Sequence, residues 1–394
     1  IAEGTKNITG NAFYLTGISV SGVHSLIKDP FELADGVFSA EVCKKATLYV
    51  PIGTKEKYQA TKGWKEFSTI VEIADNELIE GEIFISESSN SLTFRVLSMS
   101  DKTCEGVSCD KETIGKVTIP SVAKDYTVKA IGRSAFNNCE EITEISMPNT
   151  IEEIKYDGIY SCGKLSCVSL PSSLKVLADY ALAYNPFTTI VIPKSVVTMT
   201  GNPLQGDSLL TTISVEEGNT VYESPAGGNC VVEKATKTLI AGCQTTIIPE
   251  DIKTIGNSAF YAQRKLLEIA IPVSVDTIKS YALSSTGLTN IVLPEKVRYL
   301  GSSSLGYNRI TSITIPKSVE KIDGNPLMGD SLLTTIIVEN GNKTYESPDG
   351  SNAIVEKATK MLMAGCQTTV IPNTVKPIGE YNQEIKGETN VEII

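Results

Sequence analysis

The sequence predicts a repeat solenoid, an elongated array in which short chain turns stack on one another, and three observations support this. An apolar residue followed by proline recurs at spacings of 22, 23 or 33 residues. The apolar positions around each recurrence keep one register. A larger repeat of 123 residues contains several of these small repeats. Self-similarity at such periods is the signature of solenoid architectures.

The recurring dipeptide marks ten repeats, here termed rungs. Val215 and Val338 hold the same place without the proline. Successive members are 23, 22, 23, 33, 23, 22, 22, 23 and 33 residues apart, so two rungs are lengthened. The dipeptides are Met147-Pro148, Leu170-Pro171, Ile192-Pro193, Ile248-Pro249, Ile271-Pro272, Leu293-Pro294, Ile315-Pro316 and Ile371-Pro372.

Each rung repeats apolar residues at a first position k and at k+3, k+5, k+9 and k+12. The alternation from k+3 to k+5 predicts a short strand with one buried face. Proline ends that strand because it cannot donate to a ladder. The rest of the rung returns through turns or a short helical piece such as Gly256–Tyr261. One complete set is Ile310, Ile313, Ile315, Val319 and Ile322.

A single rung cannot bury its apolar stripe, whereas stacked rungs can. We therefore expect a right-handed array whose k+3/k+5 strands form one continuous parallel sheet of about ten rungs, about 45–50 Å long at the usual strand spacing. The side chains expected to be buried include Ile269, Ile271, Ile291, Leu293, Ile313 and Ile315.

The larger repeat is an internal duplication of five rungs. Residues 201–256 and 324–379 are near copies, with GNPLQGDSLLTTI answered by GNPLMGDSLLTTI. The lengthened rung of each copy adds a predicted hairpin, formed in the first copy by Cys230–Glu233 and Thr238–Ala241 around the KATK turn. We expect the two lengthened rungs to look alike and to project from the same side.

The part before the rungs is expected to contain two further regions. Residues 1–75 form a small domain or the end of a preceding array, with 47–73 as a cap-like segment. Residues 76–126 alternate like strands and form a β-rich cap of the main array, residues 127–394. An end cap is needed because an exposed terminal rung offers unpaired backbone. The residues expected to cover the open end are Leu48, Val50, Trp64, Phe67 and Ile70.

Two segments, IGRSAFNNCEEITEISMPNTIEEI (131–154) and IGNSAFYAQRKLLEIAIPVSVDTI (255–278), resemble the BspA-like leucine-rich-repeat family. The resemblance covers about 130–379. It implies a leucine-rich-repeat fold and a protein attached to or exported through a bacterial envelope, as in Bacteroidetes, where some members are adhesins. The family offers no catalytic residues to carry over. Three short segments also resemble the O-glycosylation sequon of such exported proteins, at Asp207-Ser208, Asp276-Thr277 and Asp330-Ser331.

Composition excludes several classes of function. The net charge of -11 argues against nucleic acid, which requires clustered lysine and arginine, and against docking on an anionic membrane. No apolar run approaches the roughly 20 residues of a membrane helix. The chain opens at Ile1 without a signal peptide, so we expect a mature or trimmed form of a secreted or cell-surface protein.

Catalytic chemistry has few candidates. His24 is the single histidine, which nearly removes the commonest general base and metal ligand. Most of the nine cysteines are expected to be free and buried, above all Cys243 and Cys366, which replace apolar residues at k. A disulfide, Cys104–Cys109 or Cys162–Cys167, is the alternative. No catalytic, cofactor or metal site is predicted, and we expect no enzyme.

The predicted function is binding, of a host or bacterial protein in the first place and of a glycan as the alternative. The outward row between k+3 and k+5 is small and uncharged, from Ser146 to Val370. Aromatic clustering on one surface would favour a glycan, and a broad apolar groove would favour a protein. Loops on a rigid scaffold tend to carry function, so the contact residues proposed are on the hairpins: Tyr222, Tyr345, Lys234, Lys237, Lys357 and Lys360.

Overall fold

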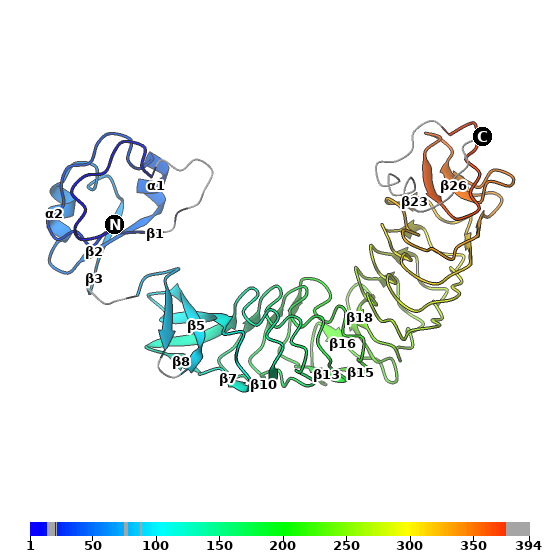
Figure 1. Cartoon of the computed structure of the whole chain (residues 1–394), viewed down its shortest axis with the longest axis horizontal. Helices are drawn as coiled ribbons and strands as arrows, with labels where there is room; N and C mark the ends of the chain where they lie inside the picture. Colours follow the sequence, from blue (N-terminus) through cyan, green and yellow to red (C-terminus); the bar gives the residue numbers. More distant parts are fainter. Residues whose placement is uncertain (14–19, 21, 75–77, 87–88, 376–394) are drawn as a thin grey trace. The chain divides into compact units, whose positions relative to one another are not determined.

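The computed structural model describes residues 1–13, 20, 22–74, 78–86 and 89–375. The chain divides into two compact units, each described here by itself. Unit 1 comprises Ile1–Ile83 and Arg95–Thr103, and unit 2 comprises Phe84–Phe94 and the chain from Cys104 onward (Figure 1).

Unit 1 is a three-stranded parallel sheet in the order β1-β2-β3, accompanied by two short helices. The cap-like segment lies inside it, and the five apolar residues expected to cover an open end are all buried in its core. Trp64 is fully buried, and its indole N–H donates to the carbonyl of Phe31. The elements are β1 (Gly22–His24), α1 (Ala40–Lys45), β2 (Thr47–Pro51), α2 (Lys55–Ala60) and β3 (Thr69–Ile73).

An eight-stranded sheet, most of whose strands lie in unit 2, joins the predicted β-rich cap to the first rungs. Its order is β14-β12-β11-β9-β6-β5-β4, with β8 paired to β9. The strands are β4 (Ile83–Ser86), β5 (Ser89–Ser98), β6 (Thr103–Cys109), β8 (Val122–Ala123), β9 (Tyr126–Ile131), β11 (Glu153–Ile154), β12 (Val176–Leu177) and β14 (Thr198–Met199).

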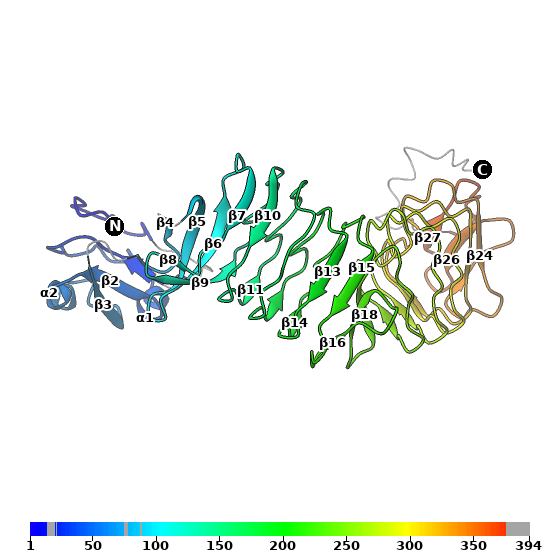
Figure 2. The same ribbon diagram turned by 90° about the horizontal axis from the view of Figure 1, so that it is seen from below.

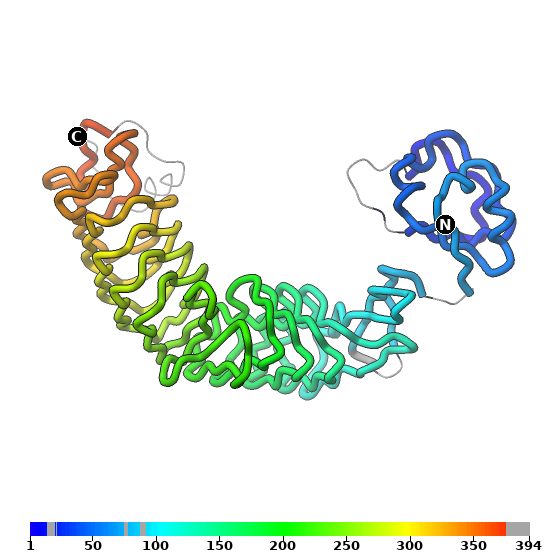
Figure 3. Tube along the Cα trace, turned by 180° about the vertical axis from the view of Figure 1, so that it is seen from behind, coloured from blue at the N-terminus to red at the C-terminus, as the bar shows by residue number. Residues whose placement is uncertain are grey.

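The rungs stack side by side to form the predicted solenoid (Figures 2 and 3). The long parallel ladder lies at k+11/k+12, however, and not at k+3/k+5 as predicted. It contains β9, β11, β12 and β14 in the first sheet. Its second part is the parallel run from β18 to β23 in a seven-stranded sheet, order β16-β17-β18-β19-β20-β21-β23, in which β16 and β17, and β17 and β18, pair antiparallel. These strands are β16 (Tyr222–Glu223), β17 (Cys230–Glu233), β18 (Thr238–Gly242), β19 (Thr254–Ile255), β20 (Thr277–Ile278), β21 (Tyr299–Leu300) and β23 (Lys321–Ile322).

At k+3/k+5 the described rungs form only separate parallel pairs. The two rungs that lack the proline both pair there, because the N–H of the next residue is available: Glu216 donates to Ile192 and Glu339 to Ile315, each at 2.9 Å. Where proline follows the strand, this bond cannot form. The pairs are β7 (Gly115–Thr118) with β10 (Ile142–Ser146), β13 (Thr189–Ile192) with β15 (Thr212–Val215), and β22 (Ser312–Ile315) with β24 (Thr335–Val338).

The core follows the predicted register. Ile313 and Ile315 are buried, as are Ile291 and Leu293. Ile269 and Ile271 are half-buried and pack against the same cluster, so the prediction of full burial is wrong for these two residues.

The segments that lead from one rung to the next, here termed the returns, contain turns and no helix among the described rungs. This corrects the helical piece expected at Gly256–Tyr261. A left-handed residue recurs every four positions along a return, as at Ser258 and Ala262 with φ of 53° and 59°. Right-handed helix cannot propagate through such residues. The returns therefore place side chains at fixed, repeated points of the surface.

Each return also buries one polar or thiol side chain that bonds to neighbouring rungs. In one of these, Asn185, the amide nitrogen donates to the carbonyl of Ile159 at 2.9 Å and Oδ1 accepts the N–H of Cys162 at 2.9 Å. This internal ladder satisfies backbone groups that the turns leave unpaired. Its described members are Cys139, Cys162, Asn185, Asp207, Gln263, Thr286, Asn308 and Asp330.

The two predicted hairpins are present. In the first copy β17 pairs antiparallel with β18, and Tyr222 lies opposite Glu233. In the second copy Tyr345 lies opposite Glu356, so the registers match after a shift of 123 residues. The second hairpin contains β25 (Tyr345–Glu346), β26 (Ala353–Glu356) and β27 (Leu362–Gly365).

Candidate functional site: a tyrosine surface on the returns

The two hairpin tyrosines that the sequence analysis proposed as ligand contacts are buried. Tyr222 and Tyr345 are 4% and 2% exposed. The phenol oxygen of Tyr222 accepts the N–H of Met199, and that of Tyr345 accepts the N–H of Ile322, each at 2.7 Å. Met199 and Ile322 each end the last strand of a ladder, so the tyrosines complete backbone bonding at the point where the regular stack is interrupted.

The four hairpin lysines are also engaged within the fold. The ammonium groups of Lys234 and Lys357 donate to the carbonyls of Asn219 and Asn342 at 2.6 and 2.5 Å. Lys237 forms ion pairs with Glu223 and Asp251, and Lys360 with Glu346. Their stems remain at the surface, but their charges already have partners.

The cysteines are free, and neither disulfide alternative forms. Cys243 is buried as predicted, whereas Cys366 is half-buried. Cys167 is exposed. Within the described ranges, no group of three or more histidine, cysteine, aspartate or glutamate side chains is placed to hold a metal.

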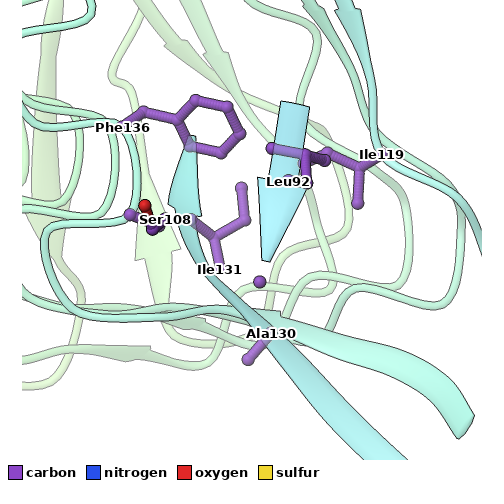
Figure 4. A pocket seen from close by; sticks show the side chains of 8 residues that line it. Leu92, Ser108, Ile119, Ala130, Ile131 and Phe136 are labelled. Carbon is purple, nitrogen blue, oxygen red and sulfur yellow. The ribbon is translucent and has the colours of Figure 1, made fainter. Parts of the chain in front are cut away.

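Two internal cavities are too small to be the main site. One, of about 10 Å³, lies in the cap between Leu92, Ile131 and Phe136 (Figure 4). The other, of about 210 Å³, lies in unit 1 beside the ion pair of Lys62 and Asp35. Ligand pockets usually measure roughly 300–1,000 Å³, so neither cavity is large enough for an ordinary ligand.

Tyrosines gather on the returns of neighbouring rungs. Tyr156 and Tyr180 lie with ring centroids 5.4 Å apart and a tilt of 52°, and Tyr160 and Tyr184 with centroids 5.2 Å apart and a tilt of 53°. Tyr261 lies near Tyr184: burial, and then the neighbouring Tyr261, raise the pKa of Tyr184. We term these five residues the tyrosine surface. Tyr156 is 39% and Tyr184 36% exposed, while the other three are half-buried.

Glycines make room for this surface. A Cβ at Gly206 would lie 2.6 Å from the ring of Tyr184, and one at Gly201 would lie 2.5 Å from the carboxyl carbon of Asp179. Gly206 also has φ of 75°, in the left-handed region that favours glycine. The motif GNPLQGD therefore shapes the surface from the rung beneath it.

The electrostatics beneath the tyrosines are acidic. Burial raises the pKa of the Asp179 carboxyl group. The amide nitrogen of Gln205 donates to Oδ1 of Asp179 at 3.1 Å, and this hydrogen bond partly opposes the shift. Burial also raises the pKa of Asp157, with Arg133 acting in the opposite direction. Burial, and then the charge of Asp179, raise the pKa of Tyr180 to about 12. Tyr180 thus stays neutral at physiological pH beside the partly desolvated carboxyl group of Asp179.

The duplicated unit provides an internal comparison for this surface. It keeps Tyr307 over Gly329 in the place of Tyr184 over Gly206. At the aligned positions of the other residues it has four serines, one tyrosine and one methionine: Ser280 for Tyr156, Tyr281 for Asp157, Ser284 for Tyr160, Ser302 for Asp179, Ser303 for Tyr180 and Met328 for Gln205. The left-handed backbone is the same at Tyr180 and Ser303. The fold therefore does not require the tyrosines or the acids.

Sequence reasoning missed this surface because it considered the strand row and the hairpins. A signal was present: tyrosines four residues apart, 156/160 and 180/184, recur in successive rungs with a separation of 24. The predicted outward row is exposed, with Ile247, Val292 and Val370 half or more accessible. No groove or aromatic group marks it out among the described residues, so it is a weaker candidate.

The comparisons with known proteins identify the family. The model of the BspA-type leucine-rich-repeat region matches six copies over residues 109–232 and 240–348. The chain belongs to this family, and its fold is a leucine-rich-repeat solenoid. None of the curated proteins searched matches it.

Solved structures that resemble the chain come from several bacteria. A pneumococcal vaccine antigen is 16% identical, with a TM-score of 0.45, covering 67% of this chain and 83% of the antigen. A leucine-rich cell-surface protein of Faecalibacterium prausnitzii is 20% identical, with a TM-score of 0.47, covering 67% and 90%. A leucine-rich-repeat protein of Eubacterium ventriosum is 19% identical, with a TM-score of 0.47, covering 66% and 80%. In the described part of this chain no helix is long and apolar enough to span a bilayer.

Proposed function

We propose that this chain is a non-enzymatic binding protein, secreted or held at the cell envelope, whose tyrosine surface contacts a protein partner. The observation that carries the proposal is the gathering of five tyrosines. Four of them lie on two successive returns where the second copy of the duplication has serine at three positions and Tyr307 at the fourth. Tyrosine and arginine are the residue types enriched at the energetic centres of protein interfaces. A tyrosine ring adds contact area at a low cost in conformational entropy.

A glycan is the second candidate. Aromatic clustering on one surface is the feature expected of sugar recognition, and the same cluster supplies it. The buried acceptors beneath the rings favour a partner that brings positive charge, which a neutral sugar does not. Bivalent use of the two hairpins has less support, since all six of their proposed contact residues bond within the fold.

The test compares the native chain with a variant carrying the residues of the duplicated unit, Tyr156→Ser, Tyr160→Ser and Tyr180→Ser. Both are immobilised and exposed to purified extracellular-matrix and bacterial surface proteins and to a glycan array. The proposal expects a protein that the native chain retains and that the variant binds at least tenfold more weakly.

A hairpin variant, Lys237→Ser with Lys360→Ser, is the control and should bind like the native chain. Loss of glycan binding alone in the tyrosine variant would select the second candidate. Equal binding of every protein and glycan to native and tyrosine variant would contradict the proposal.

A further inference from the structure

One end of the tyrosine surface already holds a cation. The guanidinium carbon of Arg133 lies 5.0 Å from the ring centroid of Tyr156. Tyr180 stands against the same ring. A guanidinium within about 6 Å of an aromatic ring is attracted by the negative face of the ring. The Tyr156–Tyr180 pair therefore has the geometry to attract positive charge.

The layer beneath this pair is rich in acceptors and short of donors. Oδ1 of Asp157 and Oε1 of Gln205 are buried without a hydrogen-bond partner in the described part of the chain. Gln205 is 2% exposed and sits beside Asp179. Lys155, adjacent to Tyr156 in sequence, is paired with Glu105 at 2.8 Å and so does not neutralise these groups. Arg133 partly offsets the charge of Asp157, so the negative potential lies mainly at Asp179.

Buried acceptors without partners are costly, and a charged donor compensates for them better than a neutral one. A cation placed over the rings gains both the ring attraction and the field of the two carboxyl groups. A hydroxyl group of a sugar gains neither to the same extent. The chemistry of this end thus selects a guanidinium or ammonium group.

We propose that the Tyr156–Tyr180 end of the tyrosine surface binds an arginine or lysine side chain presented by the protein partner. The inference rests on the proposed function and names the chemistry of the partner. Arg133 is then an internal competitor: it covers one face of Tyr156 and adds positive charge at the point where the partner's cation arrives.

Arg133 provides a test that ordinary loss of contact area cannot imitate. In the second copy of the duplication the residue aligned with Arg133 is Asn257. The variant Arg133→Asn therefore introduces a side chain that the repeat already has at this position. Its removal frees the ring and lowers the repulsion of an incoming cation. The affinity for a cationic peptide should increase severalfold, whereas a merely structural Arg133 would leave it unchanged or reduce it.

The experiment measures binding of labelled ten-residue peptides, alternating serine with arginine, lysine or glutamate, to the full chain at physiological salt. The arginine peptide should bind the native chain, bind Arg133→Asn more tightly, and bind the variant Tyr156→Ser, Asp179→Ser, Tyr180→Ser at least tenfold more weakly. The glutamate peptide should not bind. Melting temperatures confirm that each variant is folded.

Two outcomes overturn the inference. The arginine peptide could bind the native chain and the triple variant with equal affinity. The net charge of -11 would then attract the peptide nonspecifically, and the tyrosine surface would hold no cation site. Retention of a protein partner through the tyrosines without any peptide binding would refute the cation inference and leave the proposed function standing. Failure of both assays would refute the two together.

Discussion

At the scale of single residues, the two copies of the repeat use side chains to complete backbone bonding that the turns leave open. Tyr345 supplies an acceptor for Ile322, and Asn308 Nδ2 donates to the carbonyls of Leu283 and Leu305 at 2.8 and 2.5 Å. These groups are buried, so each lost bond leaves an unsatisfied polar atom. Replacing one of these side chains should therefore lower the stability of the fold.

Replacing Tyr345 with phenylalanine keeps the packing and removes the acceptor of the Ile322 N–H. Leaving a buried donor unpaired costs about 1–3 kcal/mol of unfolding free energy. Urea unfolding measures this loss, with Tyr281→Phe as the control, since Tyr281 is 44% exposed. Equal stability of the Tyr345 variant and the native chain would contradict the bonding role.

Asp330 should make stability depend on pH in an unusual direction. Burial raises its pKa to about 8. An acid whose pKa is raised on folding keeps its proton in the folded protein where the unfolded chain, with a pKa of about 4, has lost it. Its contribution to stability is undiminished below about pH 4, falls as the pH rises to about 8 with a slope of up to about 1.4 kcal/mol per unit, and is then constant.

The variant Asp330→Asn has no proton to lose and can still accept the N–H of Asn308. Its stability relative to the native chain should increase from pH 5 to pH 8. Urea unfolding at a series of pH values measures the difference. A difference that is flat across this range would show that Asp330 titrates normally.

At the scale of elements, the hairpins are fixed by one buried asparagine each. Asn342 Nδ2 donates to the carbonyls of Pro316 and Val319 at 3.0 Å, and its Oδ1 accepts the N–H groups of Thr344 and Tyr345. Asn219 makes the corresponding bonds in the first copy. The hairpin is thus attached to the rung before it by a side chain that satisfies four backbone groups.

Asn342→Ala removes all four bonds and should destabilise the second hairpin by at least about 3 kcal/mol. Hydrogen exchange should show the loss of protection in 345–365, while the first hairpin keeps its native protection and serves as the internal control. Unchanged exchange in the second hairpin would contradict this role of Asn342.

The sequence predicted some of these elements correctly and misplaced or missed others. The apolar register predicted the stack, the core and the two hairpins, because burial follows the spacing of large aliphatic residues. It misplaced the long ladder, because strand pairing depends on available N–H groups and proline removes one at k+6. It missed the tyrosine surface because left-handed turns, which decide where the returns aim their side chains, have no apolar period.

At the scale of the whole molecule, the chain is a stack of rungs in which the cysteines mostly serve as small core residues. All nine are free. Titration with a thiol reagent in denaturant, without reductant, should find nine thiols. In the native protein Cys167 should react first, since it is exposed, and Cys366 next. Seven thiols or fewer in denaturant would mean that at least one disulfide had formed.

The first copy of the duplication is proposed to carry a surface that binds positively charged side chains, and the second copy is proposed to lack it. Hydrogen exchange of the full chain, with and without the arginine–serine peptide at saturation, tests it most directly, since both units are measured in one molecule. Peptide binding should slow hydrogen exchange in residues 155–162 and 178–185 and should leave it unchanged in the aligned segments 279–286 and 301–308. Equal protection of both pairs of segments, or protection of neither, would contradict it.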